Sequence, residues 1–240
     1  MSKVKILILS GYGLNCEEET AFGFNQVGGQ AEIVHINDLI AKDKKLANYQ
    51  ILVLPGGFSY GDDTASGNAM ANRLRNHLWP QLQEFIKQKK LILGICNGFQ
   101  ILVYLGVFGR VALRWNQTGR LVDTWVDLKV GGKTPWLKGI KKLSLPVAHG
   151  EGRFYTKIKV KAALKYINNT NPNGAMQDIA GITDESGRIL GLMPHPERAQ
   201  FFTQLPDWPL SKERLLRQGK SLPKFGPGLK IFQNGVNYFR

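Results

Sequence analysis

Short apolar runs and amphipathic stretches alternate along the first part of the chain. Between the third run and the fourth, residues 69–89 place apolar side chains at intervals of three and four, which is typical of an amphipathic helix. Strands that alternate with helices are typical of a parallel sheet covered on both faces. We therefore predict an α/β fold with a mostly parallel open sheet and helices on both faces. The expected strands are Val4–Leu9, Ile33–Ile36, Ile51–Leu54 and Leu91–Ile95.

The middle of the chain has a different hydrophobic period. Residues 122–130 alternate between apolar and polar side chains, as in a half-exposed strand. Turn-forming residues at 168–174 precede two apolar runs, 179–183 and 189–193, and the turn-forming segment Asp184–Gly187 between these runs favours a hairpin. We therefore expect an antiparallel insertion or edge in the sheet.

Prolines mark the last part of the chain. Four of them between residues 206 and 227 predict a loop-rich tail at about 203–228, and an apolar-periodic segment, 229–239, follows it. The 240 residues exceed the usual domain size but fit one α/β sheet domain. We therefore predict a single domain over residues 1–240.

Composition and thiol content are those of an ordinary folded protein. Apolar residues make up 43% and charged residues 21%, which indicates neither disorder nor a fibrous fold. No window approaches the ~18 uninterrupted apolar residues of a membrane span, and the N-terminus carries no cleavable signal. Cys16 and Cys96 lack metal-ligand spacing, so we expect free thiols, no metal site and a cytoplasmic location.

The formal net charge of +14 is the one unusual bulk property, and it suggests nucleic-acid binding as a candidate function. The basic residues are spread along the chain and form no known nucleic-acid motif. A solvated surface, or a face that docks on an acidic partner, explains the surplus better. We expect neither a nucleic-acid nor a membrane partner, and a non-catalytic basic module stays an alternative.

The fourth apolar run leads into the most informative pattern. It continues into Gly94-x-Cys96-x-Gly98 and then into a helical stretch that stops near Gly106. This is a nucleophile-elbow pattern with sulfur in place of oxygen, in which glycines permit a sharp turn that holds the nucleophile at a helix N-terminus. The helix dipole there favours a thiolate. A buried cysteine in a plain turn is the alternative, and the flanking strand and helix weigh against it.

The second thiol is a weaker candidate for the nucleophile. Cys16 also follows a strand and a turn, but Glu17–Glu19 come directly after it. Their negative charge is expected to raise the pKa of Cys16 and to suppress its thiolate. We therefore predict that Cys96 is the nucleophile.

A cysteine nucleophile needs a base, and the base needs a third group that orients it. His35 falls in a predicted strand and His77 in a predicted helix, where a structural role is favoured. His195 lies just past a predicted strand end, where open α/β sheets assemble their sites, and prolines flank it. Glu197, two residues on, is near enough to orient the ring. A plain surface turn at Pro-His-Pro is the alternative.

Acyl transfer also needs hydrogen-bond donors for the oxyanion, and backbone amides supply them. Asn97 follows the nucleophile directly, and Gly57 follows the third strand, where substrate can approach the backbone closely. We predict these two as the oxyanion hole, with a plain tight turn as the alternative at Gly57. Gly11-x-Gly13 begins like a dinucleotide fingerprint, but Cys16 occupies its third glycine position.

Five motifs spread over the chain carry a family resemblance. They are Pro55–Asp62, Gly94–Gln100, His149–Phe154, Asn171–Gly174 and Met193–Arg198. Together they resemble the class I, or triad, glutamine amidotransferases. Within that family they match, in order, the glutaminase subunits of phosphoribosylformylglycinamidine synthase, over nearly the whole chain. The resemblance implies a flavodoxin-like fold of the class I amidotransferase type.

The resemblance also implies the roles of the site residues. Cys96 attacks the side-chain amide of glutamine, His195 passes the proton to the departing ammonia, and Glu197 orients His195. Glutamine contacts are implied for Gly57, Gln100, His149, Gly150 and Glu151.

The same resemblance implies partners. Ammonia passes to a separate synthetase subunit, which uses ATP and Mg²⁺ to convert formylglycinamide ribonucleotide to its amidine in purine biosynthesis. The ATP site belongs to that partner, so no cofactor is expected in this chain, and a small accessory subunit stays open. Two loops, 10–16 and 63–68, depart from the family pattern and bear on partner contacts. A cysteine hydrolase of the same architecture that acts without a partner is the second enzymatic alternative.

Overall fold

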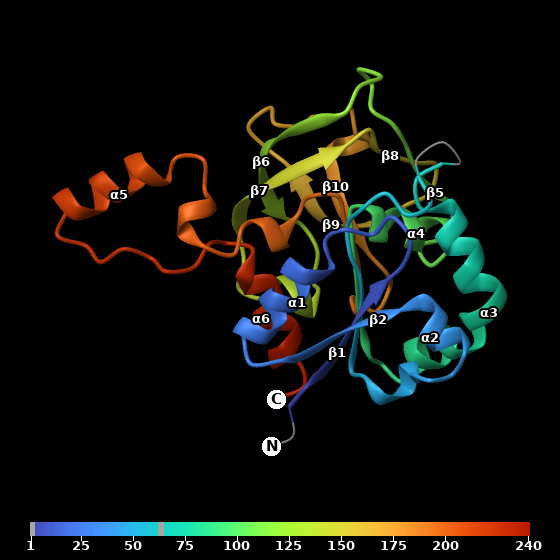
Figure 1. Ribbon diagram of the computed structural model, residues 1–240. Coiled ribbons are helices and arrows are strands. Elements are labelled where there is room, and N and C mark those ends of the chain that lie inside the picture. The colour runs from blue at the N-terminus through green and yellow to red at the C-terminus, as the bar shows by residue number, and fades with distance from the viewer. Residues whose placement is uncertain (1–2, 62–64) are drawn as a thin grey trace.

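The computed structural model describes residues 3–61 and 65–240, and a nine-stranded sheet forms its centre (Figure 1). Asp62, the last residue of the Pro55–Asp62 motif, lies outside the described residues. The strands are β1 (Lys5–Ser10), β2 (Gln30–His35), β3 (Ile51–Leu54), β4 (Leu91–Ile95), β5 (Val111–Trp115), β6 (Val122–Val130), β7 (Lys142–His149), β8 (Glu151–Thr156), β9 (Lys161–Tyr166), β10 (Ile179–Thr183) and β11 (Ile189–Leu192).

Six α-helices and several 3₁₀ helices are found in the described part of the chain. The α-helices are α1 (Glu17–Gln26), α2 (Ile36–Ile40), α3 (Asn68–Lys87), α4 (Asn97–Tyr104), α5 (Trp208–Arg217) and α6 (Leu229–Asn237). The 3₁₀ helices are η1 (Leu46–Asn48), η3 (Pro135–Leu137), η4 (Met176–Asp178), η5 (Pro196–Arg198) and η6 (Phe202–Gln204). Within residues 3–61 and 65–240, none of these helices has the length and apolar character needed to cross a membrane.

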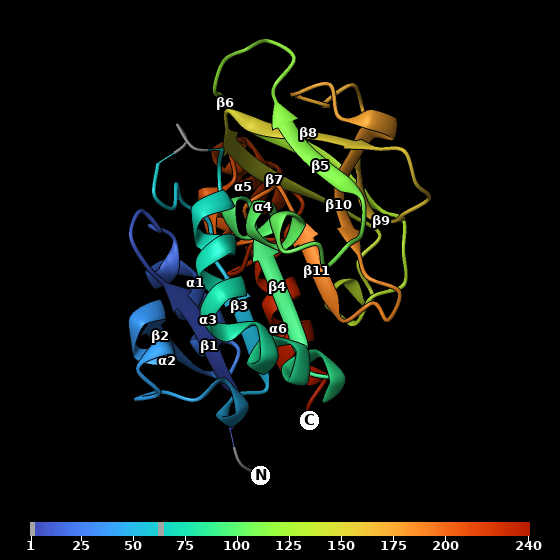
Figure 2. The same cartoon turned by 90° about the vertical axis from the view of Figure 1, so that its right-hand side faces the viewer.

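The parallel part of the sheet has the order β2-β1-β3-β4-β11, which confirms the predicted α/β fold. Successive side chains of a strand point to opposite faces, so each face has its own core. Ile8 and Val53 pack on the side of α1 and α6, whereas Leu9 and Leu52 pack on the side of α2 and α3. Figure 2 shows α3 in front of the parallel strands and α6 behind them.

The predicted antiparallel insertion extends the sheet beyond β11 in the order β10-β9-β6-β7. The predicted hairpin is confirmed, since β10 and β11 pair antiparallel with Gly181 opposite Leu192. The alternating segment 122–130 is β6. Four strands were not predicted: β7 and β9 complete the sheet, and β5 and β8 form a separate two-stranded sheet.

The second predicted strand ends earlier than its apolar run suggested. Ile36 begins α2 instead of ending β2, because His35 caps this helix. The backbone N–H of Asn37 donates to Nδ1 of His35 at 3.2 Å. This bond supports the structural role that the sequence favoured for His35.

The segment at 203–228, predicted as a loop-rich tail, contains the helix α5. Figure 1 shows this segment in orange on the left, standing away from the rest of the molecule. None of the α5 residues is buried. The chain then returns to the sheet and forms α6, which ends the structure against α1.

The turn between β4 and α4 has the predicted elbow geometry. Cys96 has φ 49° and ψ −103°, a backbone conformation that costs energy for a residue with a side chain. A Cβ atom at Gly94 would come within 2.6 Å of Leu102 Cδ1, and one at Gly98 would overlap the carbonyl oxygen of Leu54. Only glycines therefore fit on both sides of Cys96, as the sequence predicted.

Candidate active site

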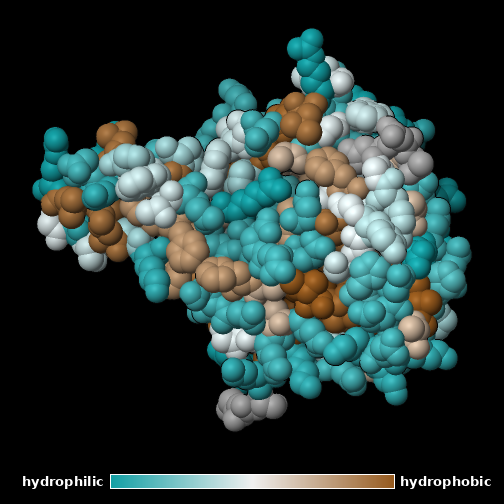
Figure 3. Space-filling view, viewed as in Figure 1, coloured by the Kyte–Doolittle hydropathy of each residue, from teal (hydrophilic) through white to brown (hydrophobic). Residues whose placement is uncertain are grey.

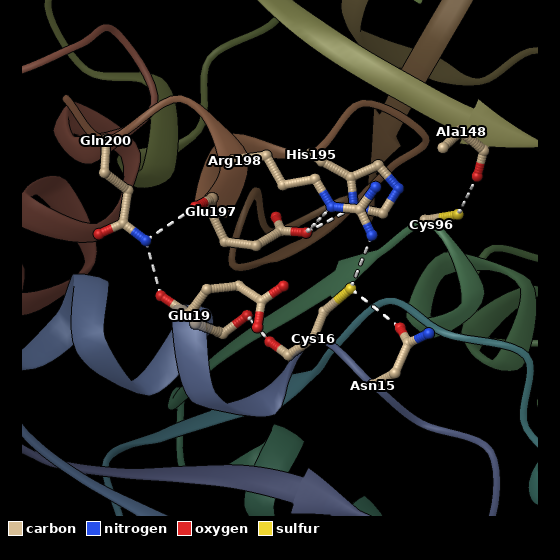
Figure 4. Close-up of polar contacts among 10 residues, drawn as sticks. Asn15, Cys16, Glu19, Cys96, Ala148, His195, Glu197, Arg198 and Gln200 are labelled. Carbon is tan, nitrogen blue, oxygen red and sulfur yellow. Dashed lines mark hydrogen bonds and ion pairs between the residues drawn. The ribbon is translucent and has the colours of Figure 1, made fainter. Parts of the chain in front are cut away.

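His195 and Glu197 form a buried pair just past the end of β11 (Figure 4). Nδ1 of His195 lies 2.5 Å from Oε1 of Glu197. Two further bonds fix the backbone of this segment. The N–H of His195 donates to the carbonyl of Pro146 in β7 at 2.8 Å, and Nε2 of Gln200 donates to the carbonyl of Glu197 at 2.8 Å. The imidazole is thus oriented by a carboxylate, as the sequence predicted.

The charge of Glu197 sets the protonation state of the pair. Burial opposes the charged imidazolium, but the negative charge of Glu197, with smaller contributions from Cys96 and Cys16, outweighs burial and raises the pKa of His195 well above 6.5. Nε2 of His195 is buried and has no hydrogen-bond partner within residues 3–61 and 65–240. The imidazolium therefore has one N–H held by Glu197 and one available for a reacting group.

Cys96 lies beside the imidazole at the N-terminus of α4. Cys96 is one of the residues that raise the pKa of His195. Its Sγ lies 3.7 Å from the carbonyl oxygen of Ala148 in β7. Figure 4 shows Cys96 and His195 side by side, with Ala148 beyond the sulfur. The structure therefore brings the predicted nucleophile, base and orienting carboxylate together from segments that are far apart in the sequence.

A second thiol, that of Cys16, also lies against this pair. Its sulfur, a ring nitrogen of His195 and a carboxylate oxygen of Glu197 lie within 4.8 Å of one another. Nη2 of Arg198 donates to Sγ of Cys16 at 3.3 Å, and the thiol donates to Oδ1 of Asn15 at 3.3 Å. Cys16 is completely buried, whereas Cys96 is 4% exposed. The sequence indicated Cys16 as the weaker candidate nucleophile but did not predict that it lies against His195 and Glu197. It is the second candidate thiol of the site.

The pKa of Cys16 is raised, as predicted, but for a different reason. Burial raises it most, the approach of His195 opposes the increase, and Glu197 adds to it. The neighbouring acids Glu17–Glu19 are not among the causes, and Glu17 instead accepts a hydrogen bond from Ser10 at 2.9 Å. The predicted cause was therefore wrong. The shift disfavours the thiolate of Cys16 all the same.

The same three groups are the donor types that Zn²⁺ binds, a sulfur, a nitrogen and an oxygen. Two features oppose a metal here. The guanidinium of Arg198 lies 3.3 Å from the sulfur of Cys16, and Nδ1 of His195 is already bonded to Glu197. The site is better suited to proton transfer than to metal binding.

One predicted oxyanion donor follows Cys96 directly, and the other lies in the loop after β3. Asn97 is the first residue of α4, where the backbone N–H has no acceptor within the helix. Gly57 lies in the loop after β3 with φ 147°, and a Cβ atom there would come within 2.7 Å of Leu14 Cα. Its neighbour Gly56 must also be glycine, since a Cβ would meet His195 Cε1 at 2.8 Å and Cys16 Sγ at 3.0 Å. The backbone of this loop therefore packs directly against the site.

The segment predicted to contact glutamine, His149–Glu151, joins the end of β7 to the start of β8. Nε2 of Gln100 donates to the carbonyl of Glu151 at 2.5 Å, and its Oε1 accepts from Asn97 at 2.8 Å. Oε2 of Glu151 accepts the N–H of Ser66 at 2.9 Å. Both polar atoms of the Gln100 amide thus bind protein groups. A direct contact between Gln100 or His149–Glu151 and glutamine stays a prediction.

His149 is a buried neutral histidine. Its Nδ1 lies 3.1 Å from Oδ1 of Asn116, and its carbonyl accepts from Nδ2 of Asn116 at 2.7 Å. Burial, and after it the charge of His195, lowers the pKa of His149 to about 4. No sequence pattern marked Asn116, which follows β5. Arg198 and Gln200 were also missed as contacts of the site, although Arg198 ends the Met193–Arg198 motif.

The low pKa of His149 predicts that folding stability is lost in acid. An unfolded histidine titrates near 6.5, so the stabilisation is fully present above pH 6.5 and is lost as pH falls towards 4. We expect the free energy of unfolding of the wild-type protein to fall by about 3 kcal/mol more than that of His149→Gln across this range. Urea unfolding of both proteins at each pH measures the difference. Parallel pH dependences would contradict it.

Comparisons with known proteins agree with this geometry. The CobB/CobQ-like glutamine amidotransferase domain matches residues 3–239. A phosphoribosylformylglycinamidine synthase subunit PurQ of Methanococcus maripaludis is 48% identical over 98% of this chain and 97% of its own length. One of Dehalococcoides mccartyi is 41% identical over 100% of this chain and 99% of its own length.

A solved structure extends the likeness to three dimensions. A chain in the structure of PurLQS from Thermotoga maritima superposes with a TM-score of 0.81 at 32% identity, and all of both chains is covered. Since sequence and fold both match over almost the whole length, the chain belongs to the family of phosphoribosylformylglycinamidine synthase subunits PurQ, within the glutamine amidotransferases.

Proposed function

We propose that Cys96, His195 and Glu197 are the catalytic groups with which this glutamine amidotransferase hydrolyses L-glutamine to glutamate and ammonia. The observation that supports this most is the position of His195, whose ring is held by Glu197 at 2.5 Å while Cys96 lies beside it at the elbow. The same imidazole can then serve both the attack and the release of ammonia.

The reaction begins with attack by the thiolate of Cys96 on the side-chain amide carbon of glutamine. The carbonyl oxygen takes up the electron pair, and the backbone N–H groups of Asn97 and Gly57 stabilise it. As the C–N bond breaks, the imidazolium of His195 donates its Nε2 proton to the nitrogen, and ammonia leaves. A thioester of Cys96 remains.

Water completes the cycle. Neutral His195 takes a proton from the water molecule that adds to the thioester carbon. The C–S bond then breaks, glutamate leaves, and the thiolate of Cys96 and the imidazolium of His195 are restored. Glu197 keeps Nδ1 of His195 protonated throughout, so that Nε2 alone exchanges protons.

The ammonia passes to a synthetase subunit that makes formylglycinamidine ribonucleotide in de novo purine biosynthesis. The relatives that support this are named as synthase subunits, and the solved relative comes from a structure named PurLQS. ATP and Mg²⁺ bind the synthetase in this proposal, and this chain needs no cofactor of its own. We place the complex in the cytoplasm.

Amide-labelled [15N]glutamine tests the proposal in the purified complex of this chain with its synthetase subunit. We expect glutamate release together with transfer of the label into the amidine product. A complex that contains Cys96→Ala is the control, and it should form the amidine only when ammonium salt is supplied. A wild-type complex that forms the amidine from ammonium but releases no glutamate from glutamine would contradict the proposal. Full glutamate release without the synthetase would favour a hydrolase that acts alone.

A further inference from the structure

Residues 203–228 form an arm whose two ends are fixed next to the catalytic pair. The N–H of Phe202 donates to the carbonyl of Lys224 at 3.3 Å, and Phe201 and Phe225 form a β-bridge. Closer to the site, the N–H of Gly226 donates to the carbonyl of Gln200 at 2.7 Å. The chain therefore leaves and re-enters the body within a few residues of Glu197.

The arm carries apolar and charged side chains, and none of its residues from 203 to 227 is buried by the described parts of the chain. Leu210 is 53% exposed and Leu216 is 50% exposed, and Leu222 and Phe225 at its returning end are exposed as well. Figure 3 shows brown, apolar side chains on the surface of the arm at the left of the view. Large apolar side chains that stay exposed on an ordered helix are typical of an interaction surface.

The net positive charge of the arm indicates that it fits a surface with acidic residues. Between residues 203 and 228 there are two acidic side chains, Asp207 and Glu213, and five basic ones. The basic ones are Lys212, Arg214, Arg217, Lys220 and Lys224. A helix that presents leucines among arginines and lysines fits an apolar groove with an acidic rim.

We propose that this arm docks into an acidic-rimmed apolar groove of the synthetase subunit. The inference rests on the proposed function, because the subunit that takes up ammonia must lie against this chain near Cys96 and His195. A second bond ties the base of the arm to the catalytic segment, since Gln200 donates to the carbonyl of Glu197 at 2.8 Å and to that of Glu19 at 2.6 Å. A partner held by the arm is therefore held beside the site.

The double variant Leu210→Ser/Leu216→Ser tests the docking in the full-length chain. Its affinity for the purified synthetase subunit, measured by calorimetry, should fall at least about tenfold, because two exposed anchors are removed. Glutamine hydrolysis by the isolated chain should not change. The matched control is Ile33→Ser, an exposed apolar residue on β2 at the opposite edge of the sheet, and it should bind normally.

Charge reversal distinguishes the contribution of the acidic rim to the affinity from that of the apolar groove. Arg214→Glu/Arg217→Glu should weaken binding more at low salt than at high salt, since exposed charges are screened. Unchanged affinity in the double leucine variant would overturn the proposal. So would arm variants that alter only self-association, or only binding to duplex DNA or to anionic vesicles. If the wild-type complex assembles through the arm yet releases no glutamate, docking stands and the proposed function fails.

Discussion

Cys96→Ala should lower kcat/KM for glutamine hydrolysis at least about 1,000-fold, because the reaction then loses the sulfur that forms the thioester. The geometry of the elbow ties this loss of activity to the side chain of Cys96. Cys96 sits at a strained backbone position beside His195, and the glycines around it leave no room for another arrangement. The backbone donors of Asn97 and Gly57 would still bind the oxyanion, so a small residual rate is expected. Glutamate release with and without the synthetase subunit measures it.

Cys16→Ala is the matched control, because Cys16 is the other thiol that approaches His195. Its buried sulfur has a raised pKa and is tied to Arg198, so we expect kcat to stay within about tenfold of wild type. A glutamine-analogue electrophile should label Cys96 and leave Cys16 unmodified, as peptide mapping would report. Labelling at Cys16, or loss of activity in Cys16→Ala but not in Cys96→Ala, would show that Cys16 is the nucleophile.

The local parts of this site were predictable because each has its own sequence pattern. The β4 run, the Gly94-x-Cys96-x-Gly98 turn and the strand before His195 are each encoded within about ten residues. Parallel sheets then bring strand ends to one edge, which brings Cys96 and His195 together without a special signal. The confirmed parallel pairing of β4 with β11 is the physical link between the two motifs.

The unpredicted parts depend on contacts between distant segments. β5 is partly exposed, and it pairs with β8 across about forty residues, so no local pattern indicates this pairing. Cys16 reaches the pair formed by His195 and Glu197 because β1 lies beside β3, and Gly56 leaves room for its sulfur. The dense prolines around α5 concealed a ten-residue helix, because Pro209 occupies the first turn, where a proline is tolerated.

The two site histidines have opposite protonation states although both are buried. His149 has only an amide beside it and becomes a weak base, whereas His195 has a carboxylate at 2.5 Å and becomes a strong one. Glu197 contributes most to the difference between their pKa values, since both rings are buried. A thiolate beside an imidazolium is therefore possible at His195 and not at His149. The carboxylate is thus the group on which the resting state of the site depends.

Glu197→Gln should reduce kcat for glutamine hydrolysis by about 100- to 10,000-fold while the fold is kept. The amide can still bond to Nδ1, but it no longer favours the imidazolium, so the pKa of His195 should fall and the proton for departing ammonia should be lost at neutral pH. Two-dimensional NMR of the ring nitrogens across the pH range would measure that fall, and steady-state kinetics would measure kcat. The control is Glu17→Gln, whose carboxylate accepts from Ser10 and is not bonded to His195. If Glu197→Gln left both kcat and the titration of His195 unchanged, the carboxylate would have no part in the reaction.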